Sequence, residues 1–252
     1  MTDKRKYRPR VPSASSIPGP SSGRVTRGRG ATSNPWELTN CHKLKLLRYN
    51  IQSLSSDDRL AELEAELDKI KWDILGLCEI RRNGEELLTL KSGHTFYYRE
   101  GPKPGIGGIG FMVNKTIKDR VVEVNSISDR LAYMVLRLNK MYKLKVIQAY
   151  APTSDHPDET VEEFYEDLRT LNNKIKTKYT VIMGDFNARV GKKANNNETS
   201  IGNFGLGIRN ARGQMFLNFL QANSLYAMNT FFVKQEQRKW TWRHPDGVHK
   251  NE

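Results

Sequence analysis

The sequence predicts an α/β domain built from stacked layers of helices and strands, preceded by a polar tail. Three observations indicate this fold class. Three stretches carry apolar residues at helical spacing, the middle of the chain is rich in strand candidates, and a strand, helix, strand order near the start has the form of a crossover connection. No internal repeat is visible, so we expect one domain over residues 41–252, a length sufficient to bury a core.

Residues 1–40 form a basic segment rich in Ser, Pro and Gly, with PSASSIPGPSSG at its centre. It holds eight basic and two acidic residues, a net charge of +6 out of +13 for the whole chain. Such a segment buries too little apolar surface to offset the entropy of ordering, so we expect it to be disordered. The cluster KRKYRPR fits a nuclear-import signal or a nucleic-acid-binding arm, although a plain solvated tail explains it more simply.

Charge and cysteine content narrow the class of protein. The excess of Lys and Arg favours a partner rich in phosphate, but a solubilising tail on a mildly basic domain explains the charge equally well. There is no run of about 18 apolar residues and no apolar stretch of a secretory signal. The two cysteines, Cys41 and Cys78, are too few for a disulfide framework. We expect a nuclear or cytoplasmic protein that is neither secreted nor membrane-bound.

The domain begins with the crossover unit. KLKLLRYN at 43–50 predicts a short strand that ends at Asn50. Residues 55–72 place leucines at helical spacing after a Ser or Asp cap, which predicts a helix. WDILGLCEIR at 72–81 predicts a buried strand that delivers Glu79 near its carboxyl end.

The rest of the domain alternates strands and helices. Four consecutive strand candidates, several with period-two alternation, lie at 107–114, 121–127, 130–139 and 143–150. Amphipathic patterns predict two further helices at 156–176 and 209–223. Apolar runs predict three more strands at 179–187, 224–232 and 238–244.

Several predicted strands end in polar side chains that do not belong in a core: Asn50, Glu79, Tyr150, and Asp185 with Asn187. Each has an ordinary explanation, such as a turn residue, a surface carboxylate or an Asx turn. Together, at the strand ends where ligand sites gather, they point to one chemistry. Two carboxylates can hold Mg²⁺, and two amides and a phenol can donate hydrogen bonds to phosphoryl oxygens. Without a GxSxG motif, a P-loop or a nearby Cys nucleophile, metal-assisted hydrolysis is the reaction class left.

Six segments occur in a family-specific order over about residues 44–247: LRYNIQSL, LGLCEIR, GGIGFMV, IQAYAPT, VIMGDFNARVG and WTWRHPDG. With this ordered set, of which MGDFNA is the most specific member, the chain resembles the endonuclease/exonuclease/phosphatase superfamily. It is most similar to the endonuclease domain of non-LTR retrotransposons. The resemblance implies a four-layer α/β sandwich of the deoxyribonuclease I type and a Mg²⁺-dependent DNA endonuclease, with Mn²⁺ as a possible substitute.

The resemblance also implies a role for each polar strand end. Glu79 looks like the main metal carboxylate, and Asn50 holds the position that orients it and contacts the phosphate. Asp185 matches the residue that acts on the water or the leaving group. Asn187 matches the amide that stabilises the transition state, and Tyr150 the tyrosine near the scissile phosphate.

Two further positions carry weaker assignments. Trp242 and Arg243 fall where the family lines its nucleic-acid face, although Trp240 and Trp242 fit strand core residues equally well. Gln52 stands where some members carry a second acidic residue, so metal binding is expected to rest more on Glu79.

The pattern departs from the family at the carboxyl end. Family members continue with an Ile-Asp-[Tyr/Phe] strand and close with Ser-Asp-His, whereas this sequence stops at HKNE, so we expect the C-terminal strands to be missing. A Ser-Asp-His tripeptide does occur at 154–156, in the loop after QAYAPT, where a surrogate role for His156 is the less favoured alternative. The other histidines have no expected role: His42, His94, His244 and His249.

The expected function is therefore hydrolysis of DNA phosphodiesters, weakened or lost because the terminal Asp and His are absent. An alternative of a different class is a catalytically defective, retrotransposon-derived remnant that binds nucleic acid or protein. A third possibility within the superfamily is a phosphatase for a small phosphoester, against which the basic tail argues mildly. The sequence does not predict an oligomeric state.

Overall fold

The computed structural model describes residues 43–234, 242–243 and 250–251. The segment 1–40, which we expect to be a disordered tail, lies outside these residues, as does most of the strand expected at 238–244. Among the described residues, no helix has both the length and the apolar composition needed to cross a membrane.

The first half of the domain forms a five-stranded sheet with one helix. Its elements are β1 (Leu46–Asn50), α1 (Asp57–Leu67), β2 (Ile74–Cys78), β3 (Glu85–Thr89), β4 (Thr95–Arg99) and β5 (Ile109–Val113). The strands lie in the order β1-β2-β5-β4-β3, with β1 and β2 parallel and the other neighbours antiparallel. The parallel pair connected through α1 is the crossover unit that the sequence predicts.

The second half forms a four-stranded sheet with two helices. Its elements are the 3-10 turn η1 (Lys118–Arg120), β6 (Val121–Ser126), β7 (Leu131–Arg137), β8 (Lys143–Tyr150), α2 (Asp158–Lys174), β9 (Tyr179–Asp185), α3 (Ala211–Ala222) and the 3-10 turn η2 (Met228–Thr230). The strands lie in sequence order, and β8 and β9 form the parallel pair connected through α2. Two short strands, β10 (Trp242–Arg243) and β11 (Lys250–Asn251), pair antiparallel with each other.

The start of α1 shows how local sequence sets an element. The side chain of Ser56 caps the helix by accepting a hydrogen bond from the backbone N–H of Arg59 at 3.3 Å. The helix ends at Leu67, earlier than the sequence pattern predicts, and Trp72 beyond it is buried in the core. Its buried face consists of Leu60, Leu63 and Leu67.

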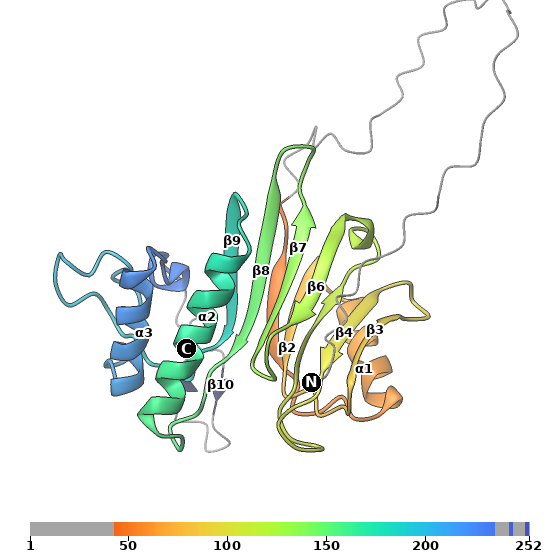
Figure 1. Cartoon of the computed structure of the whole chain (residues 1–252), viewed down its shortest axis with the longest axis horizontal. Helices are drawn as coiled ribbons and strands as arrows, with labels where there is room; N and C mark the ends of the chain where they lie inside the picture. Colours follow the sequence, from red (N-terminus) through yellow and green to blue (C-terminus); the bar gives the residue numbers. More distant parts are fainter. Residues whose placement is uncertain (1–42, 235–241, 244–249, 252) are drawn as a thin grey trace, which may run out of the picture.

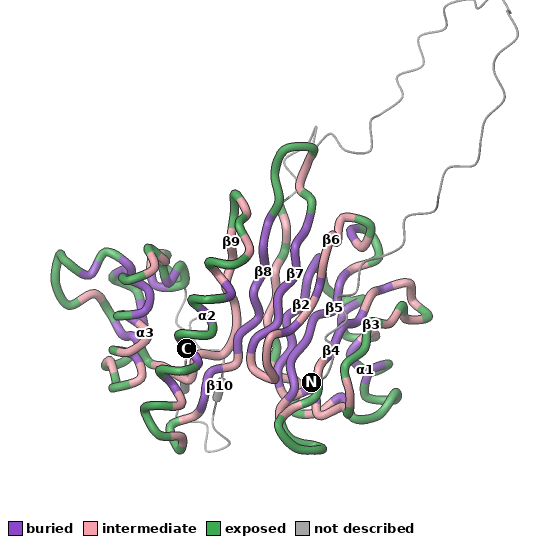
Figure 2. Tube along the Cα trace, in the orientation of Figure 1, coloured by how far each residue is buried: buried purple, intermediate pink, exposed green. Residues whose placement is uncertain are grey.

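Three buried clusters separate four layers. One packs α1 against the outer face of the five-stranded sheet, a second lies between the two sheets, and a third packs α2 and α3 against the outer face of the four-stranded sheet. Figure 1 shows α1 and the α2 and α3 pair on opposite sides of the strands, and Figure 2 shows that burial is concentrated in the strands between them. The predicted four-layer α/β sandwich is confirmed.

The structure corrects two features of the predicted element order. The prediction of a strand at 224–232 is wrong, because this segment contains the 3-10 turn η2. The buried Thr230 hydroxyl accepts from the Gly202 N–H and donates to the Ala227 carbonyl, both at 2.7 Å, so this segment is tied to a loop. The β3–β4 hairpin is absent from the prediction because neither strand alternates: β3, EELLT, is a largely exposed edge strand, and β4, TFYYR, is a short run buried along its middle.

Candidate active site

The carboxyl ends of four strands meet at one edge of the sandwich. In the first sheet, β1 and β2 are in parallel register, with Asn50 opposite Cys78, the residue before Glu79. In the second sheet, β8 and β9 end together at Tyr150 and Asp185. Since β2 packs across β8 and β9, residues from both sheets come together at this edge.

Glu79 is the centre of this cluster. Its Oε1 accepts hydrogen bonds from Asn50 Nδ2 at 2.8 Å and from the Tyr150 hydroxyl at 3.1 Å. Its Oε2 accepts from Arg81 Nη2 at 2.9 Å. One carboxylate therefore connects side chains from the loop after β2 and from the ends of β1 and β8.

The backbone at Glu79 is strained. Its φ of 58° lies in the left-handed region, which costs a non-glycine residue ~1–3 kcal/mol. The following residues are held by the glycine-rich loop before β5: the Ile80 N–H donates to Gly108 O at 3.4 Å and the Arg81 N–H donates to Gly107 O at 2.9 Å. Strain of this kind persists where the surrounding structure over-determines it, and it clusters at active sites, ligand clamps and switch regions.

The protonation states of the central pair follow from these contacts. Partial burial acts to raise the pKa of Glu79, but the hydrogen bonds from Asn50, Arg81 and Tyr150 outweigh it and lower the pKa below its usual range. Burial, together with the adjacent Glu79 charge, raises the pKa of Tyr150 to about 12. At neutral pH Glu79 is therefore an anion and Tyr150 a protonated hydrogen-bond donor.

Asp185 and Asn187 are linked to each other at the end of β9. Asp185 Oδ1 accepts from the Asn187 N–H at 3.1 Å, in the Asx-turn arrangement. Asn187 has a φ of 46°, and its Nδ2 donates to Ala151 O at 2.8 Å, which ties the end of β9 to the end of β8. Asp185 Oδ2 forms an ion pair with Arg48 of β1, which belongs to the other sheet.

Sequence reasoning missed the two arginines that contact these carboxylates. Arg48 pairs with Asp185, and Arg81 pairs with Glu79. The Nε atoms of both are buried without a hydrogen-bond acceptor among the described residues, a deficit that costs ~1–3 kcal/mol for each donor. Spacing offered a signal, because Arg48 precedes Asn50 by two residues and so shares its face of β1.

The side chains of this cluster offer Mg²⁺ part of the set of oxygen ligands that it needs. No group of three or more His, Cys, Asp and Glu side chains that could enclose a metal occurs in the described part of the chain. Gln52, at the position of a possible second acid, contributes its backbone N–H to Asn50 Oδ1 at 3.3 Å. Mg²⁺ is commonly held by one or two carboxylates together with substrate phosphate and water. Glu79 can supply such a carboxylate and Asn50 an amide oxygen, without an all-protein cage.

The two described histidines lie away from the carboxylates. His156, of the Ser-Asp-His tripeptide, contacts Thr153 Oγ1 through Nδ1 at 3.1 Å and Arg130 Nη2 through Nε2 at 3.3 Å. His94 is buried and accepts the Lys115 N–H through Nδ1 at 3.0 Å. Neither ring contacts Glu79 or Asp185 in the structure, so a surrogate general base has no support here.

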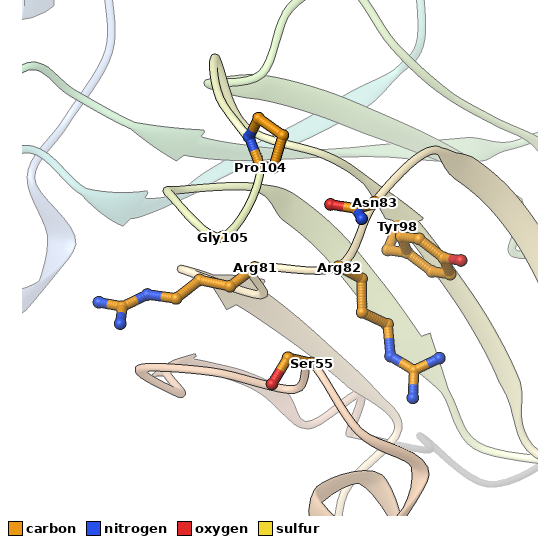
Figure 3. Close-up of a pocket in the computed structure, with 7 residues that line it drawn as sticks. All are labelled: Ser55, Arg81, Arg82, Asn83, Tyr98, Pro104 and Gly105. Atoms are coloured by element: carbon orange, nitrogen blue, oxygen red, sulfur yellow. The ribbon is translucent and has the colours of Figure 1, made fainter.

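A hollow of about 420 Å³ lies beside Glu79, on the side of the five-stranded sheet. It is lined by Ser55, Arg81, Arg82, Asn83, Tyr98, Pro104 and Gly105. Figure 3 shows Arg81 and Arg82 extending in different directions from the loop after β2. Arg82 is fixed by Leu54 O at 2.6 Å and Arg81 by Glu79 Oε2 at 2.9 Å, so both cations of this hollow are held in place by acceptors of the protein.

The assignments at Trp242 and Arg243 stay predictions. The structure describes their backbone in β10 but not their side chains, and Trp240 lies outside the described residues.

The fold and the cluster define an α/β sandwich protein with an enzyme-like site at the carboxyl ends of its central strands. The chain belongs to the Endonuclease/Exonuclease/phosphatase family, whose sequence model matches residues 49–248. Members of this family are hydrolases that act on phosphodiester bonds, and its nucleases generally use divalent metal ions.

Two curated relatives are similar in sequence. Craniofacial development protein 2 from Bos taurus is 33% identical over 206 residues, which are 81% of this chain and 34% of the relative. Its counterpart from Tragulus javanicus is 34% identical over 201 residues, 79% of this chain and 34% of the relative. The chain thus spans about a third of the length of these relatives.

Two solved structures that align with most of the chain share little sequence with it. A 3′ phosphatase, NExo from Neisseria, bound to a product DNA hairpin, has a TM-score of 0.46 at 16% identity, covering 71% of both chains. A humanized D. rerio TDP2 has a TM-score of 0.48 at 16% identity, covering 82% of this chain and 79% of that one.

Proposed function

We propose that this domain hydrolyses phosphodiester bonds of DNA with a divalent metal ion, Mg²⁺ or Mn²⁺, and that it is of the non-LTR retrotransposon endonuclease type. One observation carries the proposal: Glu79 is an ionised carboxylate that Asn50, Tyr150 and Arg81 orient at the shared end of four strands. Such a carboxylate is a ligand suited to Mg²⁺. Family membership and the ordered sequence motifs support the choice of reaction.

Each residue of the site has its own role in the proposed hydrolysis. Glu79 holds the metal, and Asn50 and Tyr150 fix its carboxylate. When bound, the metal supplies positive charge against the phosphoryl oxygens. Asp185 orients the attacking water or assists the leaving oxygen, and the Asn187 amide donates to phosphoryl oxygens where charge develops.

DNA as the substrate is supported by charge. The chain carries a net +13, and the hollow beside Glu79 presents Arg81 and Asn83. Basic side chains bind a nucleic-acid backbone by releasing its condensed counterions. In this proposal the basic side chains bind the strand, and the two carboxylates, Glu79 and Asp185, lie at the scissile phosphate. In this proposal Trp242 and Arg243 contact the nucleic acid as well.

A second candidate function is binding of nucleic acid without turnover. Two contacts favour it: Asp185 is paired with Arg48, and His156 is engaged by Arg130 and Thr153. A general base that is neutralised by a cation activates water poorly. Weakened or absent hydrolysis is the expected consequence.

Nicking of supercoiled plasmid separates the two candidates. Wild type would be assayed with Mg²⁺, with Mn²⁺ and with a chelator, beside Glu79→Gln and Asp185→Asn. Glu166→Gln is the matched control, because Glu166 is an exposed carboxylate on α2 that pairs with Arg169. The endonuclease proposal expects metal-dependent nicking that both site variants abolish and the control preserves. DNA binding without nicking under any of these conditions supports the second candidate instead.

A soluble phosphomonoester is tested as a second substrate in the same experiment. Release of phosphate from this compound, with no nicking of the plasmid, would contradict a DNA substrate and support a phosphatase for small phosphoesters. The same Glu79→Gln variant tests whether the same carboxylate is responsible.

A further inference from the structure

Arg130 lies beside the candidate active site but has no assigned role. It immediately precedes β7, and its guanidinium carbon lies over the Tyr150 ring, 5.7 Å from the centroid. The Tyr150 N–H donates to Arg130 O at 2.9 Å, and Arg130 Nη1 donates to Tyr150 O at 3.5 Å. Backbone and side-chain contacts therefore keep this cation next to the tyrosine that binds Glu79.

The imidazole of His156 holds the other side of the guanidinium. Its Nε2 is 3.3 Å from Arg130 Nη2. Because a guanidinium can only donate, Nε2 must accept with its lone pair, and the proton of the neutral ring must sit on Nδ1. That proton is donated to Thr153 Oγ1, 3.1 Å away. A chain of contacts thus runs from Thr153 through His156 to Arg130.

The loop that carries His156 is itself anchored. Arg212 of α3 donates to the His156 carbonyl and, through Nη1, to Asp158 Oδ1 at 2.7 Å. The His156 N–H donates to Thr153 O at 3.2 Å, which closes a tight turn. The backbone of this loop is therefore held in place without Arg130, and the Thr153 hydroxyl gives the ring a second partner besides Arg130.

We propose that Arg130 contacts a phosphate of the bound strand on the side of the four-stranded sheet, and that His156 is its positioning residue and not a general base. The inference rests on the proposed function and names a residue that recognises its substrate. Arg130 is only partly buried, and its two Nη contacts leave further N–H groups of the guanidinium for phosphate oxygens. Arg81 reaches Glu79 from the five-stranded sheet, so the two sheets would contribute one cation each around the Glu79 and Tyr150 pair.

The tautomer of His156 is the direct test of the positioning contact, and it needs neither DNA nor metal. Two-bond ¹H–¹⁵N correlation spectra of the histidine rings, with the His156 signals assigned by their loss in His156→Gln, report which nitrogen carries the proton. The proposal expects the proton on Nδ1 at slightly alkaline pH. A proton on Nε2 would overturn the positioning role, since Nε2 could then not accept from Arg130.

The phosphate contact is tested by the affinity for a fluorescent DNA duplex, measured by anisotropy in a chelator so that no turnover is required. Arg130→Gln should weaken binding about tenfold, the loss of one charge-assisted hydrogen bond. His156→Leu should weaken it by a smaller factor, and His156→Gln, whose side chain can still accept from Arg130, should restore it. Arg169→Gln is the matched control, because this exposed arginine on α2 pairs with Glu166 and should change nothing.

The outcomes distinguish this inference from the proposed function. Wild-type affinity in Arg130→Gln, with the wild type binding DNA, overturns the phosphate contact alone. Equal losses in His156→Leu and His156→Gln overturn the positioning role. A wild type that neither binds nor cuts DNA contradicts the proposed function and this inference together, whatever the tautomer of His156.

Discussion

Both ends of β8 carry polar side chains that are largely shielded from water, but these side chains have different roles at the two ends. Near its start, Lys145 is 1% exposed, and its Nζ donates to Asn172 O at 2.7 Å, Asn172 Oδ1 at 2.8 Å and Ile175 O at 2.9 Å. At its other end, Tyr150 donates to Glu79, which is also bound by Asn50 and Arg81. In Figure 1, β8 runs the length of the sandwich between these two ends.

The difference separates polar groups that stabilise the fold from those that bind a ligand. An ammonium group has three N–H donors, and all three of those of Lys145 are matched by acceptors at the carboxyl end of α2, so nothing is left to bind. The Tyr150 end gathers ionisable groups on strained backbone. Of the six non-glycine residues with positive φ among the described residues, five follow β1, β2 or β9: Gln52, Ser53, Glu79, Arg81 and Asn187.

The largest expected effect is on activity at the Tyr150 end. Glu79→Gln keeps the shape of the side chain and removes its charge, so we expect the rate of metal-dependent nicking to fall about a thousandfold. The free energy of unfolding, measured by urea denaturation, should fall by no more than about 1 kcal/mol, because the amide oxygen of the substituted side chain still accepts from Asn50 and Tyr150 and the contact that weakens is the one with the partly exposed Arg81. A variant that unfolds as readily as a core mutant would show that this carboxylate stabilises the fold.

The next effect is on stability at the Lys145 end. Lys145→Met fills a similar volume but leaves the acceptors of Asn172 and Ile175 unpaired, so we expect the free energy of unfolding to fall by about 2 kcal/mol. The nicking rate per folded molecule should stay at the wild-type value. A large fall in that rate would contradict the separation of the two ends.

A more gradual effect, spread over several pH units, is the pH dependence that Lys145 gives to folding. Burial, aided by the charge of Lys176, lowers its pKa from 10.5 to about 8 in the folded state. Between these values the unfolded chain binds the extra proton, so the free energy of unfolding attributable to Lys145 rises with pH, by up to about 1.4 kcal/mol per pH unit. Denaturation of wild type and Lys145→Met across this window should give curves that differ in slope; parallel curves would contradict the lowered pKa.

The smallest effect concerns the long loop between β9 and α3, where Glu198 accepts from Arg209 at 2.6 Å and 2.7 Å. The Arg209 hydrogen bonds lower the pKa of Glu198 from 4.5 to about 2. The pair therefore stabilises the fold fully above pH 4.5 and loses this contribution as the pH falls toward 2. The stability difference between wild type and Glu198→Gln should be constant near neutrality and vanish in acid; a difference independent of pH would contradict the ion pair.

Much of the fold follows from local patterns in the sequence. Leu60, Leu63 and Leu67 predict α1 through their spacing, and the buried apolar run of β2 predicts its strand. The β3–β4 hairpin escaped prediction because neither strand shows apolar alternation: β3 is exposed at the edge of the sheet, and the three central residues of β4 are all buried. The segment 224–232 was wrongly predicted as a strand because its apolar residues pack around a loop that Thr230 anchors, a contact between distant parts of the chain.

The site, like the fold, contains residues that could be predicted from the sequence and residues that could not. Asn50, Glu79, Tyr150 and Asp185 could be placed together because parallel strands bring their carboxyl ends to one edge, and the structure brings them there. The spacing of Arg48 and Asn50 on one face of β1 offered a signal for Arg48, but Arg81 and Arg130 could not be placed, because a charged residue beside a strand looks like part of a solvated face. Their contacts depend on how the two sheets pack, which no local pattern contains.

The most direct test of the difference between the two ends is the nicking rate of Glu79→Gln and Lys145→Met, compared with wild type at equal concentrations of folded protein and with Mg²⁺ present. We expect Lys145→Met to nick plasmid within about twofold of wild type and Glu79→Gln to be slower by about a thousandfold. A Glu79→Gln variant that nicks at the wild-type rate would contradict a catalytic site built around this carboxylate.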